Sequence, residues 1–160
     1  MVCDIKSDNP TIAHQVAQVP LKRLRGGFLE YGYIVESGGK LLVISREGTN
    51  LSNYGSSRFQ VFEVDLGTMT LYEIKHLGDR ALFLGHNSSF SVDASALLYC
   101  KPNCIYFTDD CTDVYWTMPG GGGKNMGIYN LQDESVVPFF NGTSISRINP
   151  PMWVEKVTYS

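Results

Sequence analysis

A run of glycines followed by a lysine is the first feature of this sequence that suggests chemistry. Gly120 to Gly123 precede Lys124. A phosphate-binding loop of this type needs another glycine ahead of the Gly-Lys pair, with four residues in between, and a serine or threonine after the lysine. Met118 and Asn125 stand at those two positions. The run therefore predicts a loop between strands rather than a nucleotide site.

Three cysteines, Cys100, Cys104 and Cys111, are the next candidates, as zinc ligands. Structural zinc sites use pairs of ligands about two to four residues apart. The second interval here is longer, and no histidine lies nearby. Cys104 also falls within an apolar run, where a free cysteine behaves as a small hydrophobic residue. We therefore expect no metal site.

Asp109, Asp110 and Asp113 carry the oxygen ligands that a hard cation such as calcium prefers. Their stretch lacks the regular ligand alternation and the final glutamate of an EF-hand loop. We interpret it as an acidic, solvated turn that ends a strand.

The remaining titratable residues form no catalytic pattern. His14, His76 and His86 are dispersed, and no serine or cysteine has an evident base partner. Asp79 and Arg80 are candidates for an ion pair in a turn. The sequence thus predicts no catalytic residue and no cofactor.

The elements that would position all these residues are β-strands. A turn at residues 77–80 is followed by an apolar strand at 81–84, a half-buried strand at 89–92 and a second apolar strand at 104–107. Short apolar runs bounded by turn residues are typical of buried strands.

Four more strands are predicted ahead of this stretch, and they lie at residues 31–36, 41–44, 59–64 and 70–75. Gly38 and Gly39 between the first two strands indicate a hairpin. The polar, turn-rich residues 46–57 predict a loop before the third strand. Short connections of this kind favour an antiparallel meander.

The strand pattern then recurs, with residues 127–131 and 136–140 following the strand at 104–107 and a loop at 109–124. A weak repeat of four-stranded meanders is typical of propeller blades. We predict an all-β fold of two antiparallel four-stranded meanders, 31–75 and 81–140, packed face to face as about two blades of a partial β-propeller. The expected core residues are Leu42, Ile44, Val61, Leu82, Leu84, Ile105, Phe107 and Ile128.

We expect the following organisation along the chain: an irregular lead-in at 1–28, a first blade at 29–76, a second blade at 77–147 and a closing stub at 148–154. The length of 160 residues is consistent with one domain.

Composition narrows the class of partner. The net charge of −3 argues against nucleic acid or an anionic membrane, which both require a basic surface. The sequence shows no secretory signal and no apolar run of about 20 residues that could span a membrane. We therefore expect a cytoplasmic or nuclear protein with reduced cysteines.

Five blocks of the sequence, in order, are residues 33–43, 77–85, 103–110, 126–131 and 150–154. They resemble the plant proteins that join an F-box to a β-propeller known as "domain of unknown function 295", of the KIB type. The resemblance covers about residues 28–154. It implies a non-catalytic, protein-binding propeller module related to the substrate-receptor part of those F-box proteins.

In the family that the sequence resembles, an N-terminal helical F-box docks the Skp adaptor of a cullin ubiquitin ligase. Residues 1–28 offer apolar positions for only about two helical turns between Pro10 and Pro20. We therefore expect the F-box to be missing and the Skp adaptor not to be a partner.

A protein target is expected to bind at the loops, since loops on a rigid sheet scaffold often carry function. The possible partner-binding residues are Asn50, Asn53, Tyr54, Asp110, Asp113, Tyr115 and Trp116. The alternative is an enzyme or small-molecule-binding domain with its site among the same loops.

Two blades cannot close a ring, so apolar residues are expected on the outer faces of the pair. Such patches promote association, and the isolated chain is predicted to be poorly soluble or dimeric.

Overall fold

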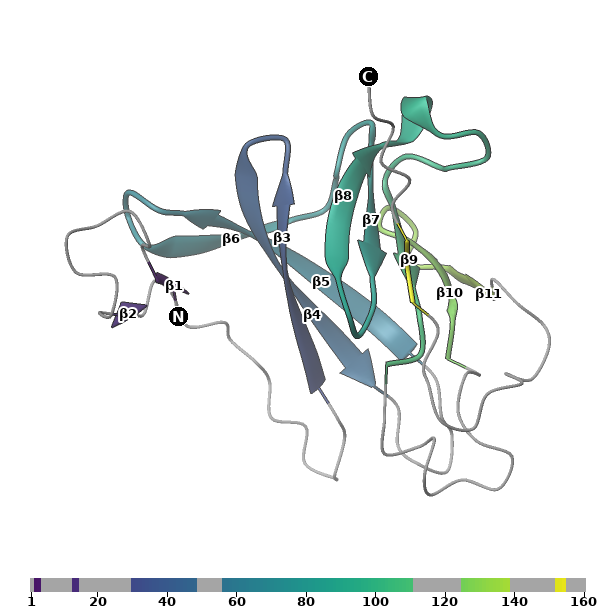
Figure 1. Cartoon of the computed structure of the whole chain (residues 1–160), viewed down its shortest axis with the longest axis horizontal. Coiled ribbons are helices and arrows are strands. Elements are labelled where there is room, and N and C mark those ends of the chain that lie inside the picture. Colours follow the sequence, from purple (N-terminus) through teal and green to yellow (C-terminus); the bar gives the residue numbers. More distant parts are fainter. Residues whose placement is uncertain are drawn as a thin grey trace.

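The computed structural model describes residues 2–3, 13–14, 30–48, 56–110, 125–138 and 152–154. Two large sheets make up most of this part of the chain, and Figure 1 shows them side by side. A separate two-stranded sheet consists of β1 (Val2–Cys3) and β2 (Ala13–His14). The helical content of the described residues is one 3-10 helix, η1 (Ala94–Ala96). The predicted all-β class is confirmed.

The first sheet is the predicted antiparallel meander. Its strands are β3 (Glu30–Ser37), β4 (Lys40–Gly48), β5 (Ser56–Asp65) and β6 (Thr70–Ile74), in that spatial order. Ser37 pairs with Lys40 across a two-residue turn. Gly38 and Gly39 have φ angles of 60° and 82° there, a conformation that glycine adopts without steric cost.

The middle strands of this sheet are longer than the sequence predicts. The loop expected at residues 46–57 is wrong at both ends, because β4 continues to residue 48 and β5 begins at residue 56. Arg46 lies within β4 and is 1% exposed. The charge of Arg46 indicated an exposed loop, but the ion-pair and hydrogen-bond partners of this side chain lie inside the protein.

The second sheet departs from the predicted four-stranded meander. It has five strands: β7 (Arg80–Leu84), β8 (Ser89–Asp93), β9 (Cys104–Phe107), β10 (Gly127–Asn130) and β11 (Val136–Pro138). Their order is β11-β10-β9-β7-β8, and β7 pairs with β9 in parallel.

The crossover that makes this pair parallel runs from β8 through η1 to β9. Two backbone bonds hold its ends beside β7: Ala94 N–H donates to the carbonyl of Asp79 at 2.9 Å, and Asn103 N–H to that of Arg80 at 2.9 Å. The chain therefore returns on the far side of β7 from β8. The small and polar residues of the crossover gave no sign of this change of direction.

The two sheets pack face to face, as predicted. One cluster of buried side chains draws on both: Tyr33, Val35, Leu42, Ile44, Phe59, Val61, Leu82, Leu84, Ile105, Phe107, Tyr129 and Leu131. The Phe59 ring contacts Phe107 and Tyr129 with centroids 5.0 and 5.1 Å apart. Of the predicted core residues, all are buried here except Ile128, which is half-buried and packs on the opposite face of the second sheet.

That opposite face carries a group of aromatic side chains. Phe83 stacks on Phe90 and Tyr106 and meets Trp153 edge-on. Trp153 also donates from Nε1 to the carbonyl of Leu84 at 2.9 Å, so its side chain packs on this sheet.

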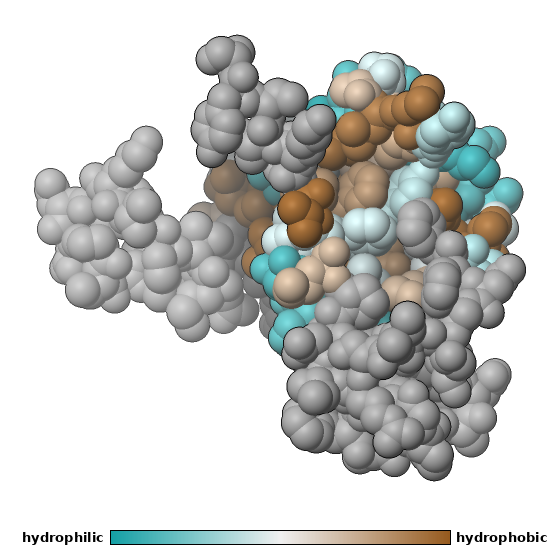
Figure 2. Space-filling model, turned by 45° about the vertical axis from the view of Figure 1, so that its right-hand side comes forward, coloured by the Kyte–Doolittle hydropathy of each residue, from teal (hydrophilic) through white to brown (hydrophobic). Residues whose placement is uncertain are grey.

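Several large hydrophobic side chains that follow η1 or flank Trp153 in the sequence remain exposed. Figure 2, with the side of the second sheet turned forward, shows hydrophobic residues between polar ones. The exposed ones in the segment after η1 and in residues 152–154 are Leu97, Leu98, Tyr99, Met152 and Val154. The association expected from such patches stays a prediction.

The contact between β10 and its neighbours generates a stability prediction. A Cβ atom at Gly127 would lie 2.8 Å from the backbone oxygen of Val137 and 3.1 Å from the Phe107 ring. Because strand pairing fixes that oxygen, Gly127→Ala should lower the free energy of unfolding by about 1–3 kcal/mol. Urea unfolding followed by fluorescence measures this loss.

Gly32→Ala is the matched control. Gly32 also lies in a strand, but nothing lies within 4 Å of the position that a Cβ atom would take there. The substitution should leave stability unchanged or raise it by about 0.4–1 kcal/mol. Equal unfolding midpoints for the two variants would contradict the tight packing at Gly127.

Candidate functional site

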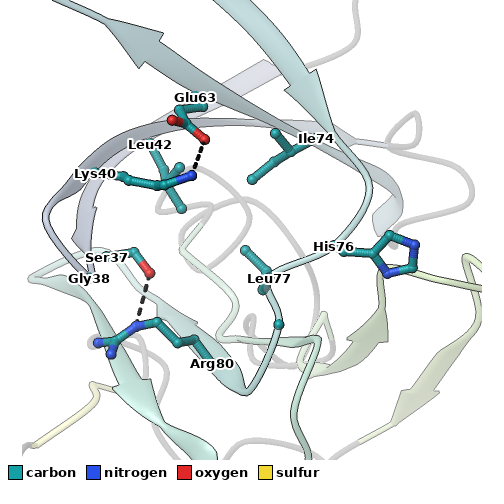
Figure 3. A pocket seen from close by; sticks show the side chains of 10 residues that line it. Ser37, Gly38, Lys40, Leu42, Glu63, Ile74, His76, Leu77 and Arg80 are labelled. Carbon is teal, nitrogen blue, oxygen red and sulfur yellow. Dashed lines mark hydrogen bonds and ion pairs between the residues drawn. The ribbon is translucent and has the colours of Figure 1, made fainter.

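A cavity of about 340 Å³ lies where the β3–β4 turn meets the connection between β6 and β7. We call it the seam cavity, because it receives residues from the first sheet and from the start of the second. It is lined by Ser37, Gly38, Lys40, Leu42, Glu63, Ile74, His76, Leu77, Gly78 and Arg80. Figure 3 shows these side chains around the hollow.

The first-sheet side of the seam cavity combines an ion pair with apolar side chains. Lys40 Nζ lies 2.9 Å from Glu63 Oε2, and the lysine side chain is 61% exposed. Ile74 and Leu77 are partly buried and pack against the main core. The hollow thus has a polar rim above an apolar floor.

Arg80 forms the other side of the cavity (Figure 3). Its Nε donates to Ser37 Oγ at 3.1 Å and to Ser91 Oγ at 2.8 Å. Its Nη2 donates to the Ser91 carbonyl at 3.2 Å. Since the two serine hydroxyls are 2.7 Å apart, Arg80 fastens β3 to β8 at this point.

The Asp79–Arg80 pair considered from the sequence is not among the ion pairs of the described residues. The serine oxygens occupy Nε and Nη2 of Arg80 instead. The seam cavity therefore presents two cations, Lys40 and Arg80, and one carboxylate, Glu63, with His76 at its edge.

A second polar cluster lies deep between the sheets, around Arg46. Its Nη1 is 2.8 Å from Asp110 Oδ1 and donates to the carbonyl of Thr108 at 2.9 Å. Its Nη2 donates to the carbonyl of Asn125 at 3.2 Å. The guanidinium also lies over the Phe107 ring, 4.8 Å from the centroid. All these partners come from the second half of the chain.

Tyr33 completes the cluster. It receives a hydrogen bond from Arg46 Nη1 at 3.1 Å and donates its own proton to Asp110. Burial raises the pKa of the Tyr33 hydroxyl far above its usual range, although the Arg46 charge opposes the shift. Tyr33 is thus a neutral donor, and the carboxylate of Asp110 balances the charge of Arg46.

Two acidic residues are placed differently from the sequence interpretation. Asp109 and Asp110 are 0% and 6% exposed, so the predicted solvated turn is wrong at both. Asp110 faces the protein interior rather than a loop surface because Arg46 lies there. The other possible partner-binding residues lie outside the described residues, and their role stays a prediction: Asn50, Asn53, Tyr54, Asp113, Tyr115 and Trp116.

The cysteines offer little for metal chemistry in the described part of the chain. Cys100 and Cys104 are free, and burial raises the pKa of both thiols. Cys111 lies outside the described residues. Within those residues no three His, Cys, Asp or Glu side chains gather closely enough to hold a metal ion. No helix there has the dimensions and hydrophobicity of a membrane span.

The sequence prediction missed the seam cavity, because it assigned recognition to the long loops. One signal was available: Arg80 stands directly ahead of a fully apolar strand, beside a glycine turn at Gly78. This position alone does not show that Arg80 is half-buried, because its serine partners lie on β3 and β8.

Comparison with known proteins identifies the family to which this fold belongs. The KIB1-4 beta-propeller family matches residues 1–130, which include the first sheet and the second as far as β10. The chain belongs to the KIB1-4 beta-propeller family. The predicted resemblance to plant F-box proteins with this propeller is confirmed.

Three relatives from Arabidopsis thaliana illustrate the match. "Probable F-box protein At1g65740" is 28% identical over 119 residues, covering 69% of this chain and 32% of the relative. "F-box protein At2g17690" is 41% identical over 51 residues, covering 32% and 12%. "F-box protein At4g35733" is 34% identical over 68 residues, covering 42% and 19%.

The chain spans about a third or less of the length of these curated relatives. No solved structure matches the chain. Membership of a β-propeller family whose relatives are F-box proteins makes this chain a protein-interaction module.

The Arg46 cluster generates the second prediction. Arg46→Met leaves the Asp110 carboxylate buried without its cation, so the free energy of unfolding should fall by about 3–5 kcal/mol. Asp110→Leu should cost a similar amount. The double variant should cost less than the sum of the two, because neither charge then remains. Urea unfolding of all four proteins measures the coupling.

Arg58→Gln is the control, because the ion pair of Arg58 with Glu134 is exposed on both sides. Its loss should cost less than about 1 kcal/mol. Strictly additive losses at Arg46 and Asp110 would contradict the pairing described here.

Proposed function

We propose that this chain is the target-binding propeller of a substrate receptor for a ubiquitin ligase, and that its role is to hold a target protein without catalysis. The observation that carries this proposal is the family match over residues 1–130. The relatives are named F-box proteins. An F-box docks the ligase adaptor, which leaves the propeller to select the target.

The geometry supports binding at the seam cavity. Its rim charges stand on a rigid frame of paired strands, and Ser37, Ser91 and Arg80 join the two sheets there. A hollow of about 340 Å³ is near the lower end of the range for small-molecule sites, roughly 300–1,000 Å³. It suits one projecting side chain of a protein better than a large metabolite.

The free thiols of Cys100 and Cys104 are compatible with the cytoplasm or nucleus, where thiols stay reduced. We propose the cytoplasm or nucleus as the place of action.

The test joins this chain to the F-box of an Arabidopsis relative and expresses the fusion in plant cells. Proteins lost in its presence, and restored by a proteasome inhibitor, are candidate targets. Each candidate is then purified and titrated with the isolated chain. A true target should bind directly, and the variant Lys40→Glu, which reverses a charge at the cavity rim, should weaken binding by about tenfold.

Val137→Ala is the matched control, since Val137 is an exposed residue of β11, away from the cavity lining. It should bind and deplete targets as the unaltered chain does. If the fusion depletes no protein, or if the depleted proteins do not bind the purified chain, the proposal is wrong.

A further inference from the structure

Arg80 differs from the other arginines of the described residues in how its charge is balanced. Arg46 pairs with Asp110, and Arg58 pairs with Glu134. Arg80 is half-buried and makes no ion pair within the described part of the chain. Its hydrogen bonds go to two serine hydroxyls and one backbone carbonyl, which are all neutral.

A carboxylate does lie in the neighbourhood, but it is engaged elsewhere. The Oδ1 atom of Asp93 accepts from the backbone N–H of Ser95 at 2.9 Å and from its hydroxyl at 2.6 Å. These bonds from Ser95 are the main cause of the lowered pKa of Asp93, and the Arg80 charge contributes least to the shift. Asp93 interacts with the Arg80 charge, but it makes no direct ion pair with Arg80 within the described residues.

The serine contacts fix Arg80 without using its whole binding capacity. A guanidinium has five N–H donors in a planar fork that matches carboxylate and phosphate groups. The serines occupy Nε and one Nη2 donor, and the Nη1 donors have no partner among the described residues. A fixed, half-desolvated fork of this kind binds an anion with little loss of side-chain entropy.

Lys40 supplies a second cation on the opposite side of the same cavity (Figure 3). Its exposed pair with Glu63 stabilises the protein by only about 0–1 kcal/mol. Lys40 can therefore exchange Glu63 for a more highly charged ligand. Gly39 and Gly78 leave the approach open, because nothing lies within 4 Å of a side-chain position at either.

We propose that the seam cavity binds an anionic side chain of the target protein, with Arg80 as the fixed contact and Lys40 as the second cation. This inference rests on the proposed function and names the chemistry of its ligand. A phosphorylated serine or threonine fits best, because its three oxygens and its charge of about −1.5 to −2 serve both cations. An aspartate or glutamate side chain offers the same chemistry with less charge.

The experiment titrates the purified chain with three small probes while its ¹⁵N NMR spectrum is recorded. The probes are the N-acetyl, N-methylamide derivatives of phosphoserine, aspartate and serine. The phosphoserine compound should shift the Arg80 Nε–H signal and the amide signals of Gly38 and Gly78. It should bind at least about tenfold more tightly than the serine compound, as charge-assisted hydrogen bonds imply.

Three variants assign the binding. Arg80→Gln should weaken phosphoserine binding by about tenfold or more, and Lys40→Ala by about fivefold. Arg58→Gln removes an equal charge away from the cavity and should change nothing. Lys40 is exposed, so Lys40→Ala should fold normally. Its binding therefore tests the proposal even if the spectrum of Arg80→Gln shows that this variant is unfolded.

The aspartate probe separates the two sources of the anion. Tighter binding of phosphoserine than of aspartate supports a phosphorylated target, and equal binding of both supports an acidic one. The inference is overturned if the serine probe binds as well as the charged probes, or if Lys40→Ala binds them as the unaltered chain does. Such a result would leave target depletion by the F-box fusion untouched.

Discussion

The buried ion pair between Arg46 and Asp110 is the constraint on which the two-sheet structure depends. A guanidinium that is 1% exposed loses its hydration, so the protein must balance its charge and satisfy its donors. The carboxylate, both carbonyl acceptors and one flanking ring come from the second half of the chain. In the observed packing of the two sheets, the second half of the chain therefore supplies the partners that compensate this buried charge.

The packing of the two sheets also brings distant residues together at the seam cavity. With the sheets fixed face to face, Ser37 of β3 and Ser91 of β8 come within 2.7 Å of each other and receive Arg80 between them. Arg46 and Arg80 thus differ in burial and in the partners of their charge. Arg46 is fully buried and pairs with a carboxylate, and so it serves the fold. Arg80 is half-buried and bonded to neutral oxygens, so no ion pair within the described residues balances its charge.

Family membership and this geometry are complementary arguments. The family identifies the chain as part of a propeller found in F-box proteins, and so as an interaction module. It does not say which surface binds or what chemistry is recognised. The seam cavity adds a rigid hollow with two cations and one weakly held carboxylate. This arrangement of charges is the basis for the proposal that the cavity takes a charged side chain of a target protein.

The sequence by itself determined the local structure, because alternating and apolar runs bounded by turn residues specify strands through short-range physics. Strands such as β9, the glycine hairpin at Gly38 and Gly39, and the face-to-face core all followed from it. Only the tertiary structure decided the parallel pairing of β7 with β9, the burial of Arg46 and Asp110, and the serine contacts of Arg80. Each of these depends on partners more than ten residues away in the sequence. A charged residue can be buried only where folding brings it a compensating partner, and the sequence near that residue does not show this partner.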